Sequence, residues 1–307
     1  MMRRTFALVL CALALVLPAC ATNERPRAAS IPRRITTTTA PASTTTTTPP
    51  PRTFANTTSP DPLAAAMDII AAEGATLDPA TSPEELSNAA IALQLGYRKL
   101  AAVDVAAENA VQAQIPDFGT RKALAENVAA ARHLIALTGT SPARDAPPAA
   151  WVIVAPAPAE ELLGYYKEGQ AATGVPWQVL ASIHLVETRY GRIRGVSSAG
   201  AQGPMQFLPS TWAAYGKGDI NSNRDAILSA AGYLKANGAP ERLDDAIFRY
   251  NHSRNYVAAI RAYANRMTDA EAAFRGYHQW QVLYRTAGGT LMLPTGWPSV
   301  PAVPVLG

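Results

Sequence analysis

Apolar and polar positions divide the chain into stretches of different character. Residues 6–17 are continuously apolar, and the chain from there to about residue 60 is dominated by polar residues and proline. From residue 61 onward, apolar side chains recur at the three- and four-residue spacing of amphipathic helices, with a proline-rich linker at residues 141–157. The pattern predicts a mainly α fold in two helical segments, residues 61–140 and 158–276.

The first helical segment contains a well-marked helix start. Ser82-Pro83-Glu84-Glu85 combines a capping serine, a proline in the first turn and two carboxylates at the positive end of the helix dipole. The segment has no cluster of titratable side chains, and we expect its lone histidine, His133, to pack rather than react. We therefore interpret residues 61–140 as a small helical accessory module.

The second helical segment carries a long irregular loop. Residues 192–208 are rich in Gly and Ser and lack helical periodicity, and loops of this length inside a compact domain tend to be functional. Beyond the segment, two apolar runs flank Ala287-Gly288-Gly289, which favours a terminal hairpin and tail over residues 277–307.

The N-terminus has the pattern of an export signal. Arg3 and Arg4 precede the apolar run, which is too short for a relaxed membrane span. The run ends in Leu17-Pro18-Ala19-Cys20, which resembles a bacterial lipobox. We expect residues 1–19 to be a signal peptide and Cys20 to be lipidated, which would anchor the protein to the outer face of the cell membrane; ordinary secretion is the alternative.

Residues 20–60 predict a disordered linker. They contain two runs of Thr and a run of three Pro, so they have little apolar surface to bury against the entropy cost of ordering. Removal of the signal peptide would also remove Cys11, which leaves Cys20 as the one remaining cysteine and excludes an intrachain disulfide or a zinc-ribbon site.

Net charge gives no reason to expect a nucleic-acid partner. The chain has a formal charge of +4, but seven of its 27 Lys and Arg and one of its 23 Asp and Glu precede Asp61. The remaining 20 basic and 22 acidic side chains make the helical part slightly acidic. We therefore expect no nucleic acid, and we expect a monomer.

The predicted helix over residues 175–190 places a carboxylate on an apolar stripe. Leu180, Ile183, His184 and Glu187 follow one another at helical spacing. Burial disfavours the charged form of a carboxylate and raises its pKa, which is what a general acid at neutral pH requires. Alternatively, the glutamate lies on the flank of the stripe and pairs with one of three nearby arginines: Arg189, Arg192 and Arg194. We expect His184 to be a packed neighbour.

Three motifs in order give the chain a family resemblance. Glu187-Thr188 is followed by a loop containing Gly203-Pro204-Met205-Gln206, and then by Tyr250-Asn251. This pattern resembles the lytic transglycosylases of the lysozyme-like superfamily, closest to the membrane-bound type B with features of the soluble type. The resemblance covers roughly residues 158–267 and implies a lysozyme-like helical catalytic domain with a long irregular active-site loop.

The resemblance also implies roles for individual residues. Glu187 would be the single catalytic acid and base. The residues that would bind substrate or support its cleft are Ser198, Gln206, Tyr250, Asn251, Met205 and Phe207. In the family, the positions of Ser198 and Gln206 hold the sugar, and those of Tyr250 and Asn251 contact the acid and the N-acetyl group. The positions of Met205 and Phe207 pack beneath the cleft. The chain departs from the family at Arg249, usually Ala, and at Pro204, Leu in some members.

The distribution of acids bears on mechanism. No Asp or Glu occurs in residues 188–218, and the next acids, Asp219 and Asp225, have no context that suggests a cleft. A site with one carboxylate fits substrate-assisted chemistry, in which the sugar supplies its own nucleophile. The resemblance implies that the products are 1,6-anhydromuramoyl ends made from peptidoglycan glycan strands.

A second polar pattern resembles the first half of a calcium-binding loop. The stretch begins with Asp219-x-Asn221 and continues to Ala230. Arg224 occupies the position of the required glycine, and Ala230 occupies that of the bidentate glutamate. We interpret this stretch as a polar turn that caps the following helix, and we expect no metal and no cofactor.

Two alternatives stay open from the sequence. One is a muramidase of goose-lysozyme type, which would hydrolyse the same bond with water. The other is a non-catalytic lipoprotein that binds the cell wall. In each case the expected partners are peptidoglycan glycan strands and, through the N-terminal lipid, the membrane.

Overall fold

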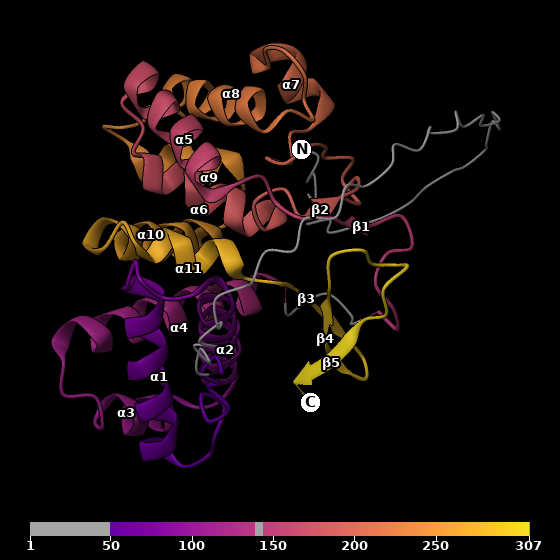
Figure 1. Cartoon of the computed structure of the whole chain (residues 1–307). Coiled ribbons are helices and arrows are strands. Elements are labelled where there is room, and N and C mark those ends of the chain that lie inside the picture. Colours follow the sequence, from indigo (N-terminus) through magenta and orange to yellow (C-terminus); the bar gives the residue numbers. More distant parts are fainter. Residues whose placement is uncertain (1–49, 139–143, 307) are drawn as a thin grey trace, which may run out of the picture.

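The computed structural model describes residues 50–138 and 144–306. The expected signal peptide, the lipidation site Cys20 and most of the expected linker lie outside these residues. The described part contains eleven helices and two small antiparallel sheets (Figure 1). The prediction of a mainly α fold is confirmed, and the arrangement is consistent with a lysozyme-like helical domain. In the described ranges no helix has both the length and the apolar character needed to cross a bilayer.

Four helices make up the first helical segment: α1 (Pro62–Leu77), α2 (Pro83–Ala102), α3 (Val105–Gln112) and α4 (Phe118–Thr138). The predicted start of α2 is present, because the Ser82 hydroxyl accepts a hydrogen bond from the backbone N–H of Glu85 at 3.2 Å. Apolar side chains of α1, α2 and α4 then fall on buried faces, which gives these helices a core to pack around.

Seven helices follow the proline-rich linker: α5 (Ala159–Thr173), α6 (Trp177–Thr188), α7 (Pro209–Tyr215), α8 (Asn223–Ala236), α9 (Leu243–Tyr250), α10 (Arg254–Asp269) and α11 (Ala273–Gln279). The polar stretch before α8 caps that helix, since the Ser222 hydroxyl accepts from the backbone N–H of Asp225. Within the described residues, no three His, Cys, Asp or Glu side chains gather in a way that could hold a metal ion.

The strands are short and lie beside the helices. β1 (Val152–Ile153), within the proline-rich linker, pairs with β2 (Ile193–Arg194) in the irregular loop. β3 (Val282–Thr286) and β4 (Gly289–Leu293) form an antiparallel hairpin in the segment where the sequence favours one. β5 (Val303–Leu306) adds a third strand to the edge of β4.

One continuous hydrophobic core joins the two helical segments. It runs from Phe54 to Trp280 and includes buried residues of α1, α2 and α4 as well as of α5, α6, α8 and α10. Figure 1 shows α10 in the middle of this arrangement, between the helices of the first segment and those of the second; α10 packs against α4 on one side and α6 on the other. The linker at residues 141–157 therefore separates the two segments in the sequence, while their helices pack into one core.

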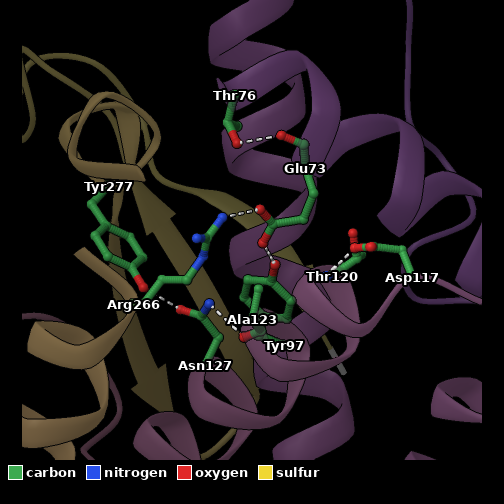
Figure 2. Close-up of polar contacts among 9 residues, drawn as sticks. All are labelled: Glu73, Thr76, Tyr97, Asp117, Thr120, Ala123, Asn127, Arg266 and Tyr277. Carbon is green, nitrogen blue, oxygen red and sulfur yellow. Dashed lines mark hydrogen bonds and ion pairs between the residues drawn. The ribbon is translucent and has the colours of Figure 1, made fainter. Parts of the chain in front are cut away.

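A buried polar network lies in this shared core (Figure 2). The carboxylate of Glu73 on α1 accepts hydrogen bonds from the Tyr97 hydroxyl and, at 2.8 Å, from Nη2 of Arg266 on α10. The Tyr277 hydroxyl donates to Oδ1 of Asn127 at 2.7 Å, which links α11 to α4. Because these groups are removed from water, their mutual contacts hold the first helical segment in a defined position on α10.

Candidate active site

Glu187 lies in the last turn of α6, at the end of a buried stripe. Leu180, Ile183 and His184 on the same stripe are fully buried, as the spacing predicts. The Glu187 side chain is partly buried, and its Oε1 accepts a hydrogen bond of 2.6 Å from the hydroxyl of Tyr256 on α10. Burial raises the pKa of Glu187 to about 7, and the Tyr256 hydrogen bond opposes this rise. A carboxyl group with such a pKa holds a proton at neutral pH and can release it.

In the structure, Glu187 does not pair with any of the three neighbouring arginines. Arg189 donates instead to the carbonyl of Leu185, and Arg192 to the carbonyl of His278 at 3.0 Å. Arg194 reaches the carbonyl of Asn221 at 3.5 Å. Among the described residues Glu187 forms no ion pair, so nothing cationic offsets the cost of ionising it.

The chain turns sharply after α6 and brings the irregular loop back to it. Arg189, Tyr190 and Gly191 have left-handed φ values of 53°, 60° and 77°, a strained run for the two residues that carry a Cβ. Thr188 stabilises the turn: its buried hydroxyl donates to the carbonyl of Pro204 at 2.6 Å and accepts from the backbone N–H of Gly191 at 2.9 Å. The residue after the candidate acid therefore ties the loop to α6.

The loop itself closes into a small turn around Gly203-Pro204-Met205-Gln206. Gln202 and Phe207 exchange two backbone hydrogen bonds of 2.9 Å, and Nε2 of Gln206 donates to the carbonyl of Gly203 at 3.0 Å. Gly203 has a φ of 73°, and a Cβ there would lie 2.0 Å from the carbonyl oxygen of Ile220, so no other residue fits.

The structure buries two loop residues and connects them to Tyr250. Met205 is fully buried and Phe207 nearly so. The Tyr250 hydroxyl donates to the carbonyl of Met205 at 2.7 Å, and its ring contacts that of Phe207. Burial raises the pKa of Tyr250, and the nearby charge of Glu187 adds to the rise. Tyr250 thus lies close to the candidate acid but makes its hydrogen bond to the loop.

Tyr256 is the residue that sequence reasoning missed. The family resemblance assigned contact with the acid to Tyr250, whereas the hydroxyl that bonds Glu187 is that of Tyr256. A usable signal was present in the apolar face of α10, where Tyr256, Ile260 and Tyr263 recur at helical spacing and are all buried. Periodicity marks that face as buried without showing which helix it meets.

Ser198 and Asn251 have polar groups that the described residues leave unused. The Ser198 hydroxyl is buried and has no partner in the described chain. Asn251 follows α9 in an extended conformation, and its backbone N–H donates to the carbonyl of Ile247. The side-chain amide of Asn251 is partly exposed and makes no hydrogen bond within the described ranges. The Asn251 amide is therefore available to a ligand, whereas the Ser198 hydroxyl is covered by the protein in this structure.

The other titratable groups near α6 have structural partners. Oδ2 of Asp225 accepts from the backbone N–H of Asp219, and Oδ1 of Asp219 accepts from that of Asn221, so both acids hold the turn before α8. Nδ1 of His184 and the hydroxyl of Tyr166 are 2.7 Å apart, and burial lowers the pKa of His184 to about 3. His184 is a neutral, packed neighbour, as expected.

A comparison with protein families agrees with part of this picture. Residues 195–244 match the model of the family described as the transglycosylase SLT domain. The matched segment contains Ser198, Met205, Gln206 and Phe207, and it begins after Glu187 and ends before Tyr250. No curated protein and no solved structure matches the chain. At the level of the family, the match supports a transglycosylase that acts on peptidoglycan.

Proposed function

We propose that the protein is a peptidoglycan lytic transglycosylase in which Glu187 acts as both general acid and general base. The substrate bond is the β-1,4 linkage between N-acetylmuramic acid and N-acetylglucosamine. The observation that carries the proposal is the position of Glu187, which is partly buried in the last turn of α6 and is followed by Thr188, whose hydroxyl bonds the loop that matches the transglycosylase domain. Burial there raises the pKa of Glu187. A carboxyl group with a pKa of about 7 can serve in both roles at neutral pH.

The proposed reaction proceeds in two steps. Protonated Glu187 gives its proton to the glycosidic oxygen as that oxygen leaves C1 of N-acetylmuramic acid, while the acetamido oxygen of the same sugar stabilises the developing positive charge. The carboxylate of Glu187, held by Tyr256, then takes the proton of the C6 hydroxyl, and the C6 oxygen bonds to C1. The product is a 1,6-anhydromuramoyl end, and no water is consumed.

Two features favour this route over hydrolysis by a muramidase. Hydrolysis with inversion needs a second carboxylate to activate water, and ordinary retention needs a carboxylate nucleophile. The nearest acids after Glu187 in the sequence, Asp219 and Asp225, are engaged in their own turn. In addition, burial and the Tyr256 bond are the two causes of the shifted pKa of Glu187, with no contribution from another carboxylate.

Mass spectrometry of digested peptidoglycan tests the proposal. The full-length protein should release fragments with anhydro ends, which are lighter by one water than fragments with reducing ends. The Glu187→Gln variant should lose activity by about a hundredfold or more, because it lacks the proton donor. Reducing ends in place of anhydro ends would favour the muramidase, and unchanged cleavage by Glu187→Gln would contradict the assignment of the acid. No cleavage by the folded wild-type protein would favour the wall-binding lipoprotein.

We also propose that the protein is anchored to the outer face of the cell membrane through Cys20. The proposal rests on the lipobox-like sequence ending at that residue, which lies outside the described part of the chain. Replacing Cys20 with Ser should move the protein from the membrane fraction to the soluble fraction, whereas ordinary secretion predicts a soluble protein in both cases.

A further inference from the structure

A cavity on the outer side of α9 is separate from the groups that surround Glu187. It has a volume of about 480 Å³ and is lined by the end of α8, by α9 and by the residues on either side of α9. Its lining residues are Ala236, Asn237, Arg242, Asp245, Phe248, Arg249 and His252. No step of the proposed reaction uses any of them.

Two exposed arginines and one exposed acid line the cavity. Arg242 and Arg249 both line it, and neither forms an ion pair with any described residue. Asp245 is the one acid among the lining residues, and it too forms no ion pair within the described ranges.

The backbone makes room for one of these guanidinium groups. Gly238 has a φ of 104°, and a Cβ at that position would lie 2.9 Å from both Nε and Nη2 of Arg242. A side chain there would displace the guanidinium from its place. On the other side, the half-buried ring of Phe248 contacts the ring of His252, and Arg254 lies over the Phe248 ring at 4.6 Å. Gly238 thus leaves room for the Arg242 guanidinium, and Phe248 gives the cavity an aromatic wall.

The cavity is close to the residue expected to contact the sugar. Arg249 and His252 flank Tyr250-Asn251, and with about 3.8 Å between successive Cα atoms, both lie within about 8 Å of Asn251 along the chain. On α9, Asp245, Phe248 and Arg249 share one face, whereas the buried Ala246 and Ile247 face the core. An extended peptide of three or four residues, at about 3.3 Å per residue, can reach from one side of α9 to the other.

We propose that this cavity binds a carboxylate of the peptide carried by the muramic acid of the substrate. The inference rests on the proposed function, which supplies a substrate whose peptides have free carboxylates. Arginine suits this task because its planar guanidinium can donate two parallel hydrogen bonds to one carboxylate. Arg249 is also the position at which the chain departs from the alanine usual in the family it resembles, so the site would be a property of this chain.

Binding of the free peptide tests the inference without relying on catalysis. The full chain with Glu187→Gln is titrated calorimetrically with a sugar-free stem tetrapeptide and with the same peptide amidated at its carboxylates. We expect the amidated peptide to bind about tenfold more weakly. Adding Arg242→Gln and Arg249→Gln should weaken binding of the unmodified peptide by about the same factor. The matched control adds Arg224→Gln and Arg261→Gln, which remove two exposed arginines outside the cavity and should leave binding unchanged.

Two results would overturn the inference directly: no binding of the peptide, or equal binding by the cavity variant and the control. A third is displacement of the peptide by inorganic phosphate at a concentration lower than the peptide concentration needed for binding, which would indicate a phosphate site. In the active protein, the cavity variant should raise KM about tenfold for strands that carry peptides and leave KM unchanged for strands stripped by an amidase. Failure of the proposed function would instead be seen as cleavage that survives Glu187→Gln, which leaves the peptide titration unaffected.

Discussion

The hydroxyl of Tyr256 lies 2.6 Å from Oε1 of Glu187, and the two residues come from helices that pack against each other, α10 and α6. The hydroxyl stabilises the carboxylate and lowers the pKa of Glu187, while burial raises it. Burial is the larger effect, since the resulting pKa is about 7 rather than the ordinary 4.5. The hydrogen bond thus limits a shift that burial alone would make larger.

Replacing Tyr256 with Phe should raise the pKa of Glu187 further. Loss of a hydrogen bond to a charged group costs about 1.5 kcal/mol or more, so the basic limb of the pH profile of kcat/KM should move upward by about one pH unit. At neutral pH, kcat should fall about tenfold, because the carboxylate formed in the first step is less stable.

The pH profile of Tyr263→Phe provides the control for this change. Tyr263 is buried on the same helix and makes no hydrogen bond to Glu187. A shift of equal size in both variants would mean that the effect comes from a general disturbance of α10 and not from the lost hydroxyl.

The raised pKa of Glu187 also predicts how stability depends on pH. The folded protein holds the proton up to a pH of about 7, whereas the unfolded chain releases it near 4.5, so ionisation lowers the free energy of unfolding as pH rises between these values. The loss amounts to about 3 kcal/mol. Glu187→Gln has no such group. The free energy of unfolding of this variant minus that of wild type should therefore increase by about 3 kcal/mol from pH 4.5 to pH 8.

Denaturant unfolding of both proteins at the two pH values measures this difference. The lowered pKa of His184 makes the folded state lose stability as pH falls from 6.5 toward 3. Because His184 is present in both proteins, its contribution cancels from the difference between them. A constant difference between Glu187→Gln and wild type over this range would show that Glu187 is not desolvated.

Local features of the fold were predictable from the sequence because local rules determine them. The capping serine of α2 bonds the residue three positions later, and the stripe that ends at Glu187 is buried as its spacing indicates. The turn before α8 likewise follows from short-range hydrogen bonds of Ser222 and Asp219. In each case, the interacting groups lie within a few residues of one another.

Long-range packing was not predictable in the same way. Periodicity shows which face of a helix is apolar, but it does not show which other helix covers that face. Tyr256 meets Glu187 across 69 residues and Arg266 meets Glu73 across 193, and neither pairing has a signature in one sequence. A proline-rich linker similarly suggests separate modules, although the helices on its two sides share one core.

Thr188 should be required for activity through its hydroxyl. In Thr188→Val, the carbonyl of Pro204 and the N–H of Gly191 would lose their partner, at a cost of about 1–3 kcal/mol in the free energy of unfolding. Cleavage of peptidoglycan should fall because the loop is no longer tied to α6, and Thr188→Ser should restore both properties. Melting curves and cleavage rates measure the two effects.

Thr173→Val is a matched control for Thr188→Val. Its hydroxyl also donates to a backbone carbonyl, that of Gly169, and accepts from a backbone N–H, that of Val175, but it lies at the end of α5. Because Thr173 is only partly buried, this variant should lose less stability than Thr188→Val, and it should keep its cleavage rate per folded molecule. Equal loss of cleavage in both variants would show that Thr188 has no specific effect on the loop.

The ion pair between Glu73 and Arg266 should make the two helical segments unfold together. Both side chains are buried, and Arg266→Met would leave the Glu73 carboxylate and its Tyr97 neighbour without the compensating charge, at a cost of about 3–5 kcal/mol. The triple variant Glu73→Leu, Tyr97→Phe and Arg266→Met removes every member of this set and should recover most of the loss.

Denaturant unfolding measures the cost of breaking this pair, with the exposed pair of Lys167 and Glu271 as the reference. Lys167→Met should cost no more than about 1 kcal/mol, because that pair remains solvated. If Arg266→Met cost no more than Lys167→Met, the pair would not hold the segments together, and their shared hydrophobic core alone would join them.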